Sequence, residues 1–500
     1  MDISERNIRA TRYALIGRGT SAALLFLVSI LVARYLGPEA FGELALAMTI
    51  IVFLSVIADG GMNRSAQIHI SQHLQEEPEA VAFSCRRFLW IKIGIAGVAF
   101  LLTYLLAPWM AEVYGIAVLE PLIKTGGLLL AALIIFEYQI SIVQGYESFR
   151  SLCIAMVFDA GFRLIAILAV IALGLGVVGI MTGYAAATLI VAALLALITS
   201  IIIITFPSME NPDIKNYVPD ILRYSPPLLV STLFFIAYTK FDILALGYFG
   251  IASDVGYYSL AVGLIDNLII PLAAIEIAIL PIVASAYGRA SQKTDMNRIF
   301  NQVITMGFLF MMPVITGVTV VAHLFVTTVY GPAYQNTALI LMILTPYIFT
   351  KTLGVLNGTY LIAAREARRF MWYMFGAVIL NSSLLLVFIP QWGTVGAAFA
   401  KIATHTLLTG LMLGYVMKRF EIKVEFEALV RITKICLSAV LMGLICFVVV
   451  SITPAGVAGL VLTILSGIIV YLLLIHLSGT LPFRQMLKIV RGDIGLQLDS

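Results

Sequence analysis

The sequence predicts an all-α polytopic membrane protein with 14 transmembrane helices. Of its 500 residues, 61% are hydrophobic and 12% are charged, and the mean hydropathy is +1.03. Average soluble domains carry about twice this share of charged residues. The apolar residues form stretches that can each cross a bilayer core of about 30 Å, at a helical rise of about 1.5 Å per residue. These observations exclude an ordinary soluble domain.

The predicted helices follow one another through loops of two kinds. Loops on one side, such as 173–177 and 390–394, have almost nothing to fold, whereas loops on the other side are longer. The predicted helices span residues 13–35, 41–62, 88–110, 117–144, 151–173, 177–205, 226–250, 255–284, 299–329, 335–363, 369–389, 394–417, 434–452 and 457–477.

Lysine and arginine divide between the two sides and predict the orientation. Of the 31 Lys and Arg residues, 23 lie in the termini and in the loops that follow the even-numbered predicted helices, and seven lie within apolar stretches. Only Arg34 lies on the side of the loops that follow the odd-numbered helices. Because cytoplasmic loops carry an excess of these residues, we expect both termini in the cytoplasm and the chain in the inner (plasma) membrane. This topology explains the net charge of +4 without nucleic acid as a partner. Aromatic residues such as Trp109 and Tyr114 gather on the external side, as an interfacial belt does.

An internal repeat joins the two halves of the chain at offsets between 213 and 217 residues. The segment 36–47 returns at 249–261, with Gly42 matched by Gly256. The other matches join Val113-Tyr114-Gly115 to Val329-Tyr330-Gly331, Phe136 and Gln144-Gly145 to Phe349 and Asn357-Gly358, and Gly176 and Gly179 to Gly393 and Gly396.

The repeat predicts the domain organisation. Each repeat unit contains six helices, an even number, so both units enter the membrane in the same orientation. Parallel repeats of this type place a substrate site between the halves. We therefore predict two six-helix lobes around a central cavity, residues 1–206 and 207–420. Residues 421–500 form an added pair, helices 13 and 14, with a basic cytoplasmic tail.

The segments that carry the repeat also resemble a known family. Residues 34–42 (RYLGPEAFG) resemble the first-helix signature of Wzx-type polysaccharide and O-antigen flippases of the MOP superfamily. Residues 240–242 with 256–259, 330–334 and 393–398 resemble later motifs of that family, whereas Lys401 stands where a small or hydroxylic residue is commoner. The resemblance covers about residues 10–420 and implies flipping of a polyprenyl-diphosphate-linked oligosaccharide to the outer leaflet. The C-terminal pair leaves open kinship with the MurJ-type lipid II flippases.

Four basic residues within the spans are candidates for substrate binding, because ionisable groups in a bilayer need a partner or a watery cavity. Lys240 and Lys351 lie near the middle of their helices, where neither reaches the interface easily. Three roles are open for Arg18. It contacts a substrate phosphate, it pairs with Asp59, which lies at matching depth, or its side chain extends to the membrane interface. Lys401 shares a helix face with His405. The resemblance implies that such cations hold a diphosphate headgroup.

The acidic residues of the spans compensate these cations or bind a coupling proton or sodium ion. Lys240 and Asp242 are two residues apart and point in directions about 200° apart on a helix, so they are not paired with each other. Asp159 and Arg163 are four apart, and we expect an internal ion pair. The candidate acids are Asp59, Glu137, Asp242, Asp266 and Glu276.

The sequence carries no catalytic constellation and no P-loop, so we expect a transporter that is not an enzyme and has no cofactor. His69 and His73 are four apart, but two histidines make a poor metal site. We therefore expect a solvated polar loop there and no metal.

Three functions remain open on the sequence. The first is an alternating-access flippase for cell-surface polysaccharide or lipopolysaccharide biosynthesis, with lipid-linked oligosaccharide and membrane lipids as partners. Glycosyltransferases or a polymerase of the same pathway are candidate protein partners. The second is a cation-coupled small-molecule exporter resembling the MATE branch, which predicts a cavity dominated by acids. The third is a scaffold of a glycan-assembly complex that transports nothing.

Overall fold

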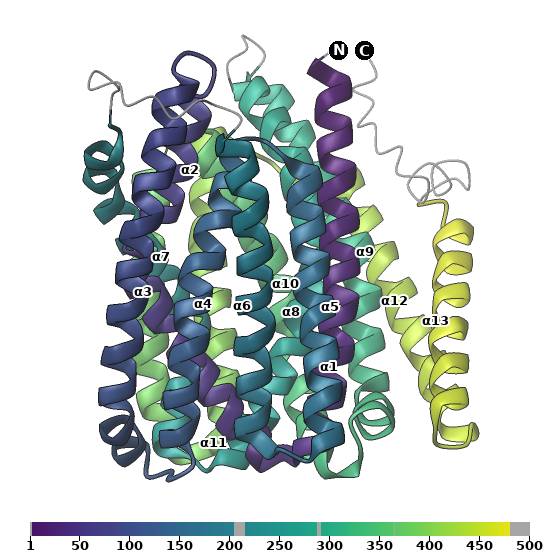
Figure 1. The fold of residues 1–500 in the computed structure, drawn as a ribbon. Helices are drawn as coiled ribbons and strands as arrows, with labels where there is room; N and C mark the ends of the chain where they lie inside the picture. Colours follow the sequence, from purple (N-terminus) through teal and green to yellow (C-terminus); the bar gives the residue numbers. More distant parts are fainter. Residues whose placement is uncertain (1–2, 205–215, 288–291, 365, 481–500) are drawn as a thin grey trace. The chain divides into compact units, whose positions relative to one another are not determined.

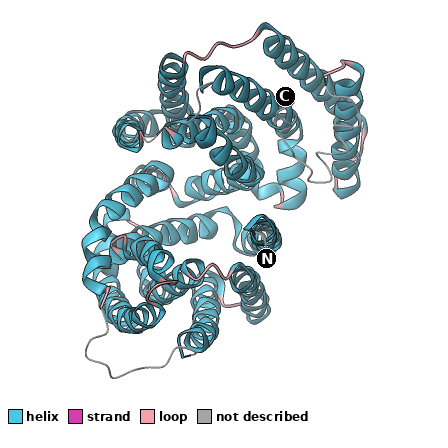
Figure 2. Ribbon diagram, turned by 90° about the horizontal axis from the view of Figure 1, so that it is seen from above, coloured by secondary structure: helices cyan, strands magenta, loops and turns pink. Residues whose placement is uncertain are grey.

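The computed structural model describes residues 3–204, 216–287, 292–364 and 366–480. Within these ranges the regular structure is helical, as Figure 2 shows in a view along the helices. Eleven helices of the described part are long and apolar enough to cross a membrane. The chain is therefore an all-α multi-pass membrane protein, as predicted.

The chain forms two compact units, Met1–Ser259 and Leu260–Ser500 (Figure 1). The predicted lobe boundary at 206/207 lies outside the described residues, and α7 packs against α1 and α2. The first unit contains α1 (Ile3–Asp59), α2 (Met62–His73), α3 (Pro78–Tyr114), α4 (Leu119–Gly145), α5 (Phe149–Leu173), α6 (Gly176–Ile204), α7 (Val218–Phe249) and the start of α8 (Ala252–Tyr287). The second contains the rest of α8, α9 (Gln292–Val329), a 3₁₀ turn (Pro332–Tyr334), α10 (Gln335–Ala363), α11 (Ala367–Phe420), α12 (Phe426–Ile452) and α13 (Val457–Leu477).

Two helices are too long for one crossing, and each is interrupted by a glycine. α1 has 57 residues and α11 has 54, and either would extend about 80 Å if it were straight. Gly37 interrupts α1 at φ 73° and ψ 175°, and Gly393 interrupts α11 at φ 55° and ψ −130°. Positive φ is accessible to glycine at little steric cost. Figure 1 shows the purple ribbon of α1 reversing its direction within the first unit.

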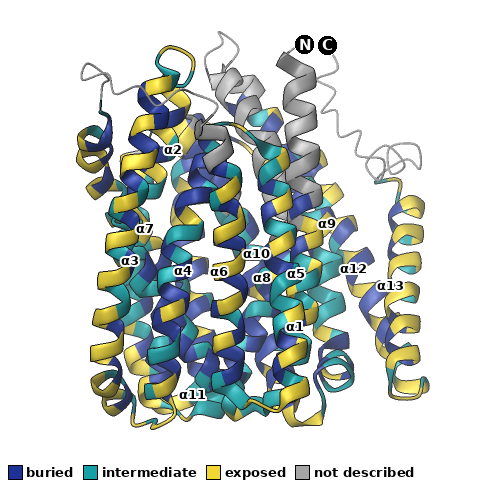
Figure 3. Ribbon diagram, viewed as in Figure 1, coloured by how far each residue is buried: buried dark blue, intermediate teal, exposed yellow. Residues whose placement is uncertain are grey.

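The outer helices present apolar side chains where lipid would be. In the most apolar window of α3 only 17% of the residues are buried, against 61% in α4. Figure 3 shows this contrast as an exposed α3 beside a more deeply buried α4. Exposed apolar surface of this extent is expected where the surrounding solvent is hydrocarbon.

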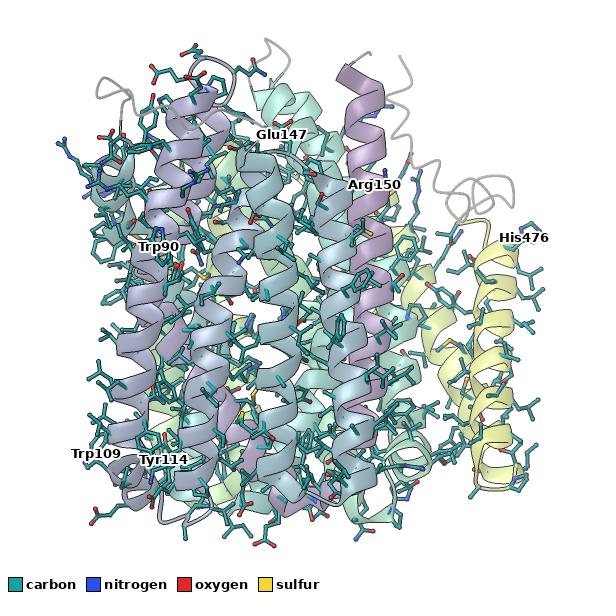
Figure 4. All side chains as sticks on the ribbon, in the orientation of Figure 1. Trp90, Trp109, Tyr114, Glu147, Arg150 and His476 are labelled. Carbon is teal, nitrogen blue, oxygen red and sulfur yellow. The ribbon has the colours of Figure 1, made fainter. Side chains whose placement is uncertain are left out.

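The two ends of the first unit differ in the residues that they carry. Figure 4 places Trp109 and Tyr114 at one end, and Glu147 and Arg150 at the opposite end. The aromatic end is the one that the charge distribution assigns to the outside.

Two glycines of the predicted repeat face each other where α1 meets the start of α8. A Cβ atom added at Gly42 would lie 1.8 Å from the carbonyl oxygen of Ala252. One added at Gly256 would lie 2.0 Å from the carbonyl oxygen of Pro38. The contacts are reciprocal, as at an interface between surfaces related by a two-fold axis. The absence of side chains here lets the two backbones touch.

The C-terminal pair α12 and α13 packs on α9. The Tyr471 hydroxyl donates to the carbonyl oxygen of Leu309 at 2.7 Å, and Gly467 lies against the Sγ atom of Cys446. A buried cluster that includes Ile435 and Met442 fills the junction. The pair is thus docked within the second unit.

The prediction of a solvated loop at His69 and His73 is wrong. Both residues lie on α2 and are half-buried, and their rings stack with centroids 4.5 Å apart. The ring of Tyr217 packs against both, and its hydroxyl donates to Glu77. The aromatic side chain of Tyr217 supplies apolar contact that the local sequence around the histidines does not reveal.

Candidate functional site

The second unit holds an ion pair halfway along a transmembrane helix. Lys351 lies about 24 Å along α10 from Gln335, at about 1.5 Å per residue. Its Nζ atom is 2.9 Å from Oδ1 of Asp266 on α8. The two side chains are 27% and 41% exposed. A half-exposed ion pair at this depth requires water or a polar cargo beside it, because contact with hydrocarbon is costly.

A tyrosine joins this pair to the second candidate lysine. Nζ of Lys351 lies 5.4 Å from the ring centroid of Tyr347, and Nζ of Lys401 lies 5.5 Å from the same centroid. The His405 ring meets Tyr347 edge-on at 4.5 Å. Because residues four apart share a helix face, α10 presents Tyr347 and Lys351 while α11 presents Lys401 and His405. We call Asp266, Tyr347, Lys351, Lys401 and His405 the α10–α11 cluster.

The members of the α10–α11 cluster differ in access. Lys401 is only 4% exposed and His405 is 9% exposed, so both are more deeply buried than Lys351. Cations over an aromatic face are stabilised by its quadrupole. The cluster as a whole combines two lysines with one aspartate, while the pair at its exposed edge, Lys351 with Asp266, carries one charge of each sign. Tyr347 carries no charge and was not predicted; its spacing of four from Lys351 is the signal that could have indicated it.

A second ion pair between helices lies in the first unit, and its lysine is fully buried. Nζ of Lys92 on α3 is 2.6 Å from Oδ1 of Asp59 at the end of α1, and the Lys92 side chain is 0% exposed. Glu137 on α4 interacts electrostatically with both. In the part of the chain that the structure describes, Asp59 therefore forms its ion pair with Lys92, and it also accepts a hydrogen bond from the Asn63 backbone N–H. The complete burial of Lys92 favours a structural role for this pair, although the Asp59 side chain is 17% exposed.

The expected pair between Asp159 and Arg163 is confirmed. Nε of Arg163 lies 3.0 Å from Oδ2 of Asp159, four residues earlier on α5. The guanidinium also contacts the hydroxyl of Thr188 at 3.3 Å and lies over the ring of Tyr184 on α6. The pair thus ties α5 to α6.

Asp242 is bound by a tyrosine. Its Oδ2 accepts a hydrogen bond of 2.7 Å from the Tyr258 hydroxyl, and the residue is 1% exposed. Lys240, two residues earlier on α7, is half-buried. Arg18 on α1 and Glu276 on α8 lie on described helices, but their side chains lie outside the described part.

The fold and these charges define a class of protein: a polytopic helical membrane protein with ionisable side chains inside its spans. The chain belongs to the polysaccharide biosynthesis protein family, whose pattern matches residues 8–287.

Two curated relatives and one solved structure extend the comparison. The chain is 24% identical over 238 residues to the probable low-salt glycan biosynthesis flippase Agl15 of Haloferax volcanii, covering 47% of this chain and 50% of the relative. It is 25% identical over 195 residues to the putative O-antigen transporter of Escherichia coli K12, covering 38% and 45%. The matches thus span half or less of the length of these relatives. The lipid II flippase MurJ in an inward closed conformation has a similar fold, with a TM-score of 0.74 at 14% identity, over 95% of this chain and 99% of that one.

Proposed function

We propose that this chain flips a polyprenyl-diphosphate-linked oligosaccharide from the cytoplasmic to the outer leaflet, for cell-surface polysaccharide biosynthesis. Membership of the polysaccharide biosynthesis family supports this, and two relatives are described as a glycan biosynthesis flippase and an O-antigen transporter. The observation that carries the proposal is the half-exposed Lys351–Asp266 pair halfway along α10. A polar headgroup crossing the bilayer needs such a charged, wetted surface.

The proposed mechanism is alternating access between two lobes of six helices, with 14 spans in all and both termini in the cytoplasm. Breaks in α1 at Gly37 and in α11 at Gly393 support two spans in each of these long helices. The reciprocal contact of Gly42 and Gly256 supports a two-fold relation between the repeats. The lipid tail stays in the bilayer while the headgroup moves through the cavity.

The proposed cations have distinct roles. Lys351, at the exposed edge of the α10–α11 cluster, contacts the diphosphate directly. Lys401 is buried near the ring of Tyr347 and adds positive potential without direct contact. Arg18 of the first lobe and Lys240 of the second lobe are further candidates. Among the acids, Asp266 orients Lys351 and is released when phosphate takes its place.

An exporter of small organic cations fits the α10–α11 cluster less well. Such a cargo needs an excess of acids, whereas the charged side chains of this cluster are two lysines and one aspartate. Lys351 and Lys401 would repel a cationic cargo in the low dielectric of the membrane interior.

The test is reconstitution of the purified chain in proteoliposomes with a fluorescent polyprenyl-diphosphate oligosaccharide. We expect protein-dependent movement between leaflets, measured by the fraction of label that an external quencher reaches. Protein-free vesicles are the control. A folded protein that moves no lipid-linked glycan, with or without an ion gradient, and instead moves an organic cation would overturn the proposal.

A further inference from the structure

A group of arginines surrounds one carboxylate where α11 begins and ends. The carboxylate of Glu366 accepts hydrogen bonds from Arg369 at 3.0 Å, from Arg419 at 3.1 Å and from the Tyr415 hydroxyl at 2.6 Å. The Arg369 guanidinium also stacks on the Tyr415 ring, 4.2 Å from its centroid. The Glu366 carboxylate is therefore shared between two arginines and holds both guanidinium groups in place.

An open pocket of about 350 Å³ lies beside this group and is lined by Glu366, Arg368, Arg369 and Trp372. Its volume falls in the range of small-molecule sites, about 300–1,000 Å³. Two arginines line it against one carboxylate, and that carboxylate also pairs with Arg419, which is outside the pocket lining. The pocket is therefore positive, and Arg368 is exposed to whatever enters it.

The surroundings of the pocket are those of a membrane surface. Arg368 and Trp372 are four residues apart on α11 and share a face. Trp372 is 57% exposed and packs edge-on against Phe375 one turn deeper into the span. Arginine above exposed tryptophan at a helix end is the arrangement that matches the headgroup level of a bilayer. The charge distribution assigns this end of α11 to the cytoplasmic leaflet, which carries the anionic lipids.

We propose that this pocket binds the phosphate of an anionic phospholipid of the cytoplasmic leaflet. The planar guanidinium groups of Arg368 and Arg369 match phosphate oxygens in paired hydrogen bonds. Trp372 and the apolar surface below it contact the upper part of the acyl chains. The site is separate from the α10–α11 cluster, and it does not depend on the proposed flippase activity.

The experiment is native mass spectrometry of the full-length protein titrated with phosphatidylglycerol or phosphatidylcholine of identical chains. Arg368→Gln is the test variant, because Arg368 lines the pocket without belonging to the Glu366 hydrogen-bond group. Lys418→Gln removes the same charge from an exposed position at the end of α11, outside the pocket lining. Unchanged thermal unfolding of both variants shows that the fold is kept.

We expect the wild type to retain phosphatidylglycerol in preference to phosphatidylcholine. Arg368→Gln should weaken that binding by about fivefold, the effect of one basic residue near an anionic surface, and Arg368→Gln/Arg369→Gln should weaken it further. Lys418→Gln should change it by less than about twofold, since it acts only through the general potential. Equal retention of the two lipids, or equal losses in Arg368→Gln and Lys418→Gln, would overturn the proposal.

A competition identifies the source of the phosphate. Undecaprenyl diphosphate is added to the protein with bound phosphatidylglycerol. Failure to displace it at equal concentration supports a phospholipid site. If undecaprenyl diphosphate displaces phosphatidylglycerol from the wild type but not from Arg368→Gln, the assignment to a resident phospholipid is overturned. The ligand of the pocket would then be the lipid diphosphate.

Discussion

Replacing Gly42 with alanine should force apart the backbones that meet at the two repeated glycines. The added Cβ would lie 1.8 Å from the carbonyl oxygen of Ala252, whereas contacts of this kind are not found below 3.0 Å. The neighbour is backbone, so no side chain can turn away, and the helices must separate by roughly 1 Å. Overpacking of this kind costs about 1–3 kcal/mol. That cost raises the population of the separated state by about 5- to 150-fold.

Hydrogen–deuterium exchange of the reconstituted protein measures this separation. In Gly42→Ala, the amides of residues 36–45 and 249–258 should exchange faster than in the wild type, by about 5- to 150-fold. Gly161→Ala is the matched control, because it adds the same methyl group within α5 at a position with no heavy atom within 4 Å. The control also accounts for the gain of about 0.5–1 kcal/mol when alanine replaces a helical glycine.

The reasoning fails if Gly42→Ala and Gly161→Ala exchange alike in both segments. Faster exchange confined to residues 36–45 would also contradict it, since the contact is reciprocal. The second substitution, Gly256→Ala, should reproduce the pattern, because its Cβ would lie 2.0 Å from the carbonyl oxygen of Pro38.

Two further predictions concern buried polar contacts in the first unit, both measured by thermal unfolding of the purified protein. Lys92→Met should destabilise it by about 3–5 kcal/mol, because Asp59 loses the partner of its buried pair, and Lys92→Met/Asp59→Asn should recover much of that loss. Additive losses in the double variant would show that the two residues are not coupled. Tyr258→Phe should cost about 1–3 kcal/mol by removing the hydroxyl that donates to the buried Asp242. Tyr248→Phe, at an exposed tyrosine, should cost nothing measurable, and equal effects of the two would refute the role of this hydrogen bond.

The helical architecture could be predicted from the sequence because hydropathy and helix length depend on local residues. Long apolar stretches mark helices whatever they pack against. The breaks near Gly37 and Gly393 were also local, since a glycine separated predicted helices at both places. The short helix α2 was missed because its residues are polar and its stability comes from packing against Tyr217, which is distant in sequence.

The pairing of charges was predicted only where both partners share a helix. Asp159 and Arg163 are four apart, so helical periodicity alone brings them together. Lys92 with Asp59 and Lys351 with Asp266 join different helices, and no spacing rule gives the rotation of one helix relative to another. Mid-membrane position identified Lys351 as a candidate, but its contact with Tyr347 depends on tertiary packing.

The proposed function is tested most directly by glycan flipping in proteoliposomes with Lys351→Met. Lys124→Met is the matched control, because Lys124 is 31% exposed and paired with Glu120, but lies near the start of α4. Lys351→Met/Asp266→Asn removes the aspartate that the single variant leaves unpaired. We expect both Lys351 variants to flip at least about tenfold more slowly, the effect of losing one charged hydrogen bond to the diphosphate. Lys124→Met should flip at the wild-type rate. Wild-type flipping by a folded Lys351→Met protein would contradict a role for the α10–α11 cluster in the transport path.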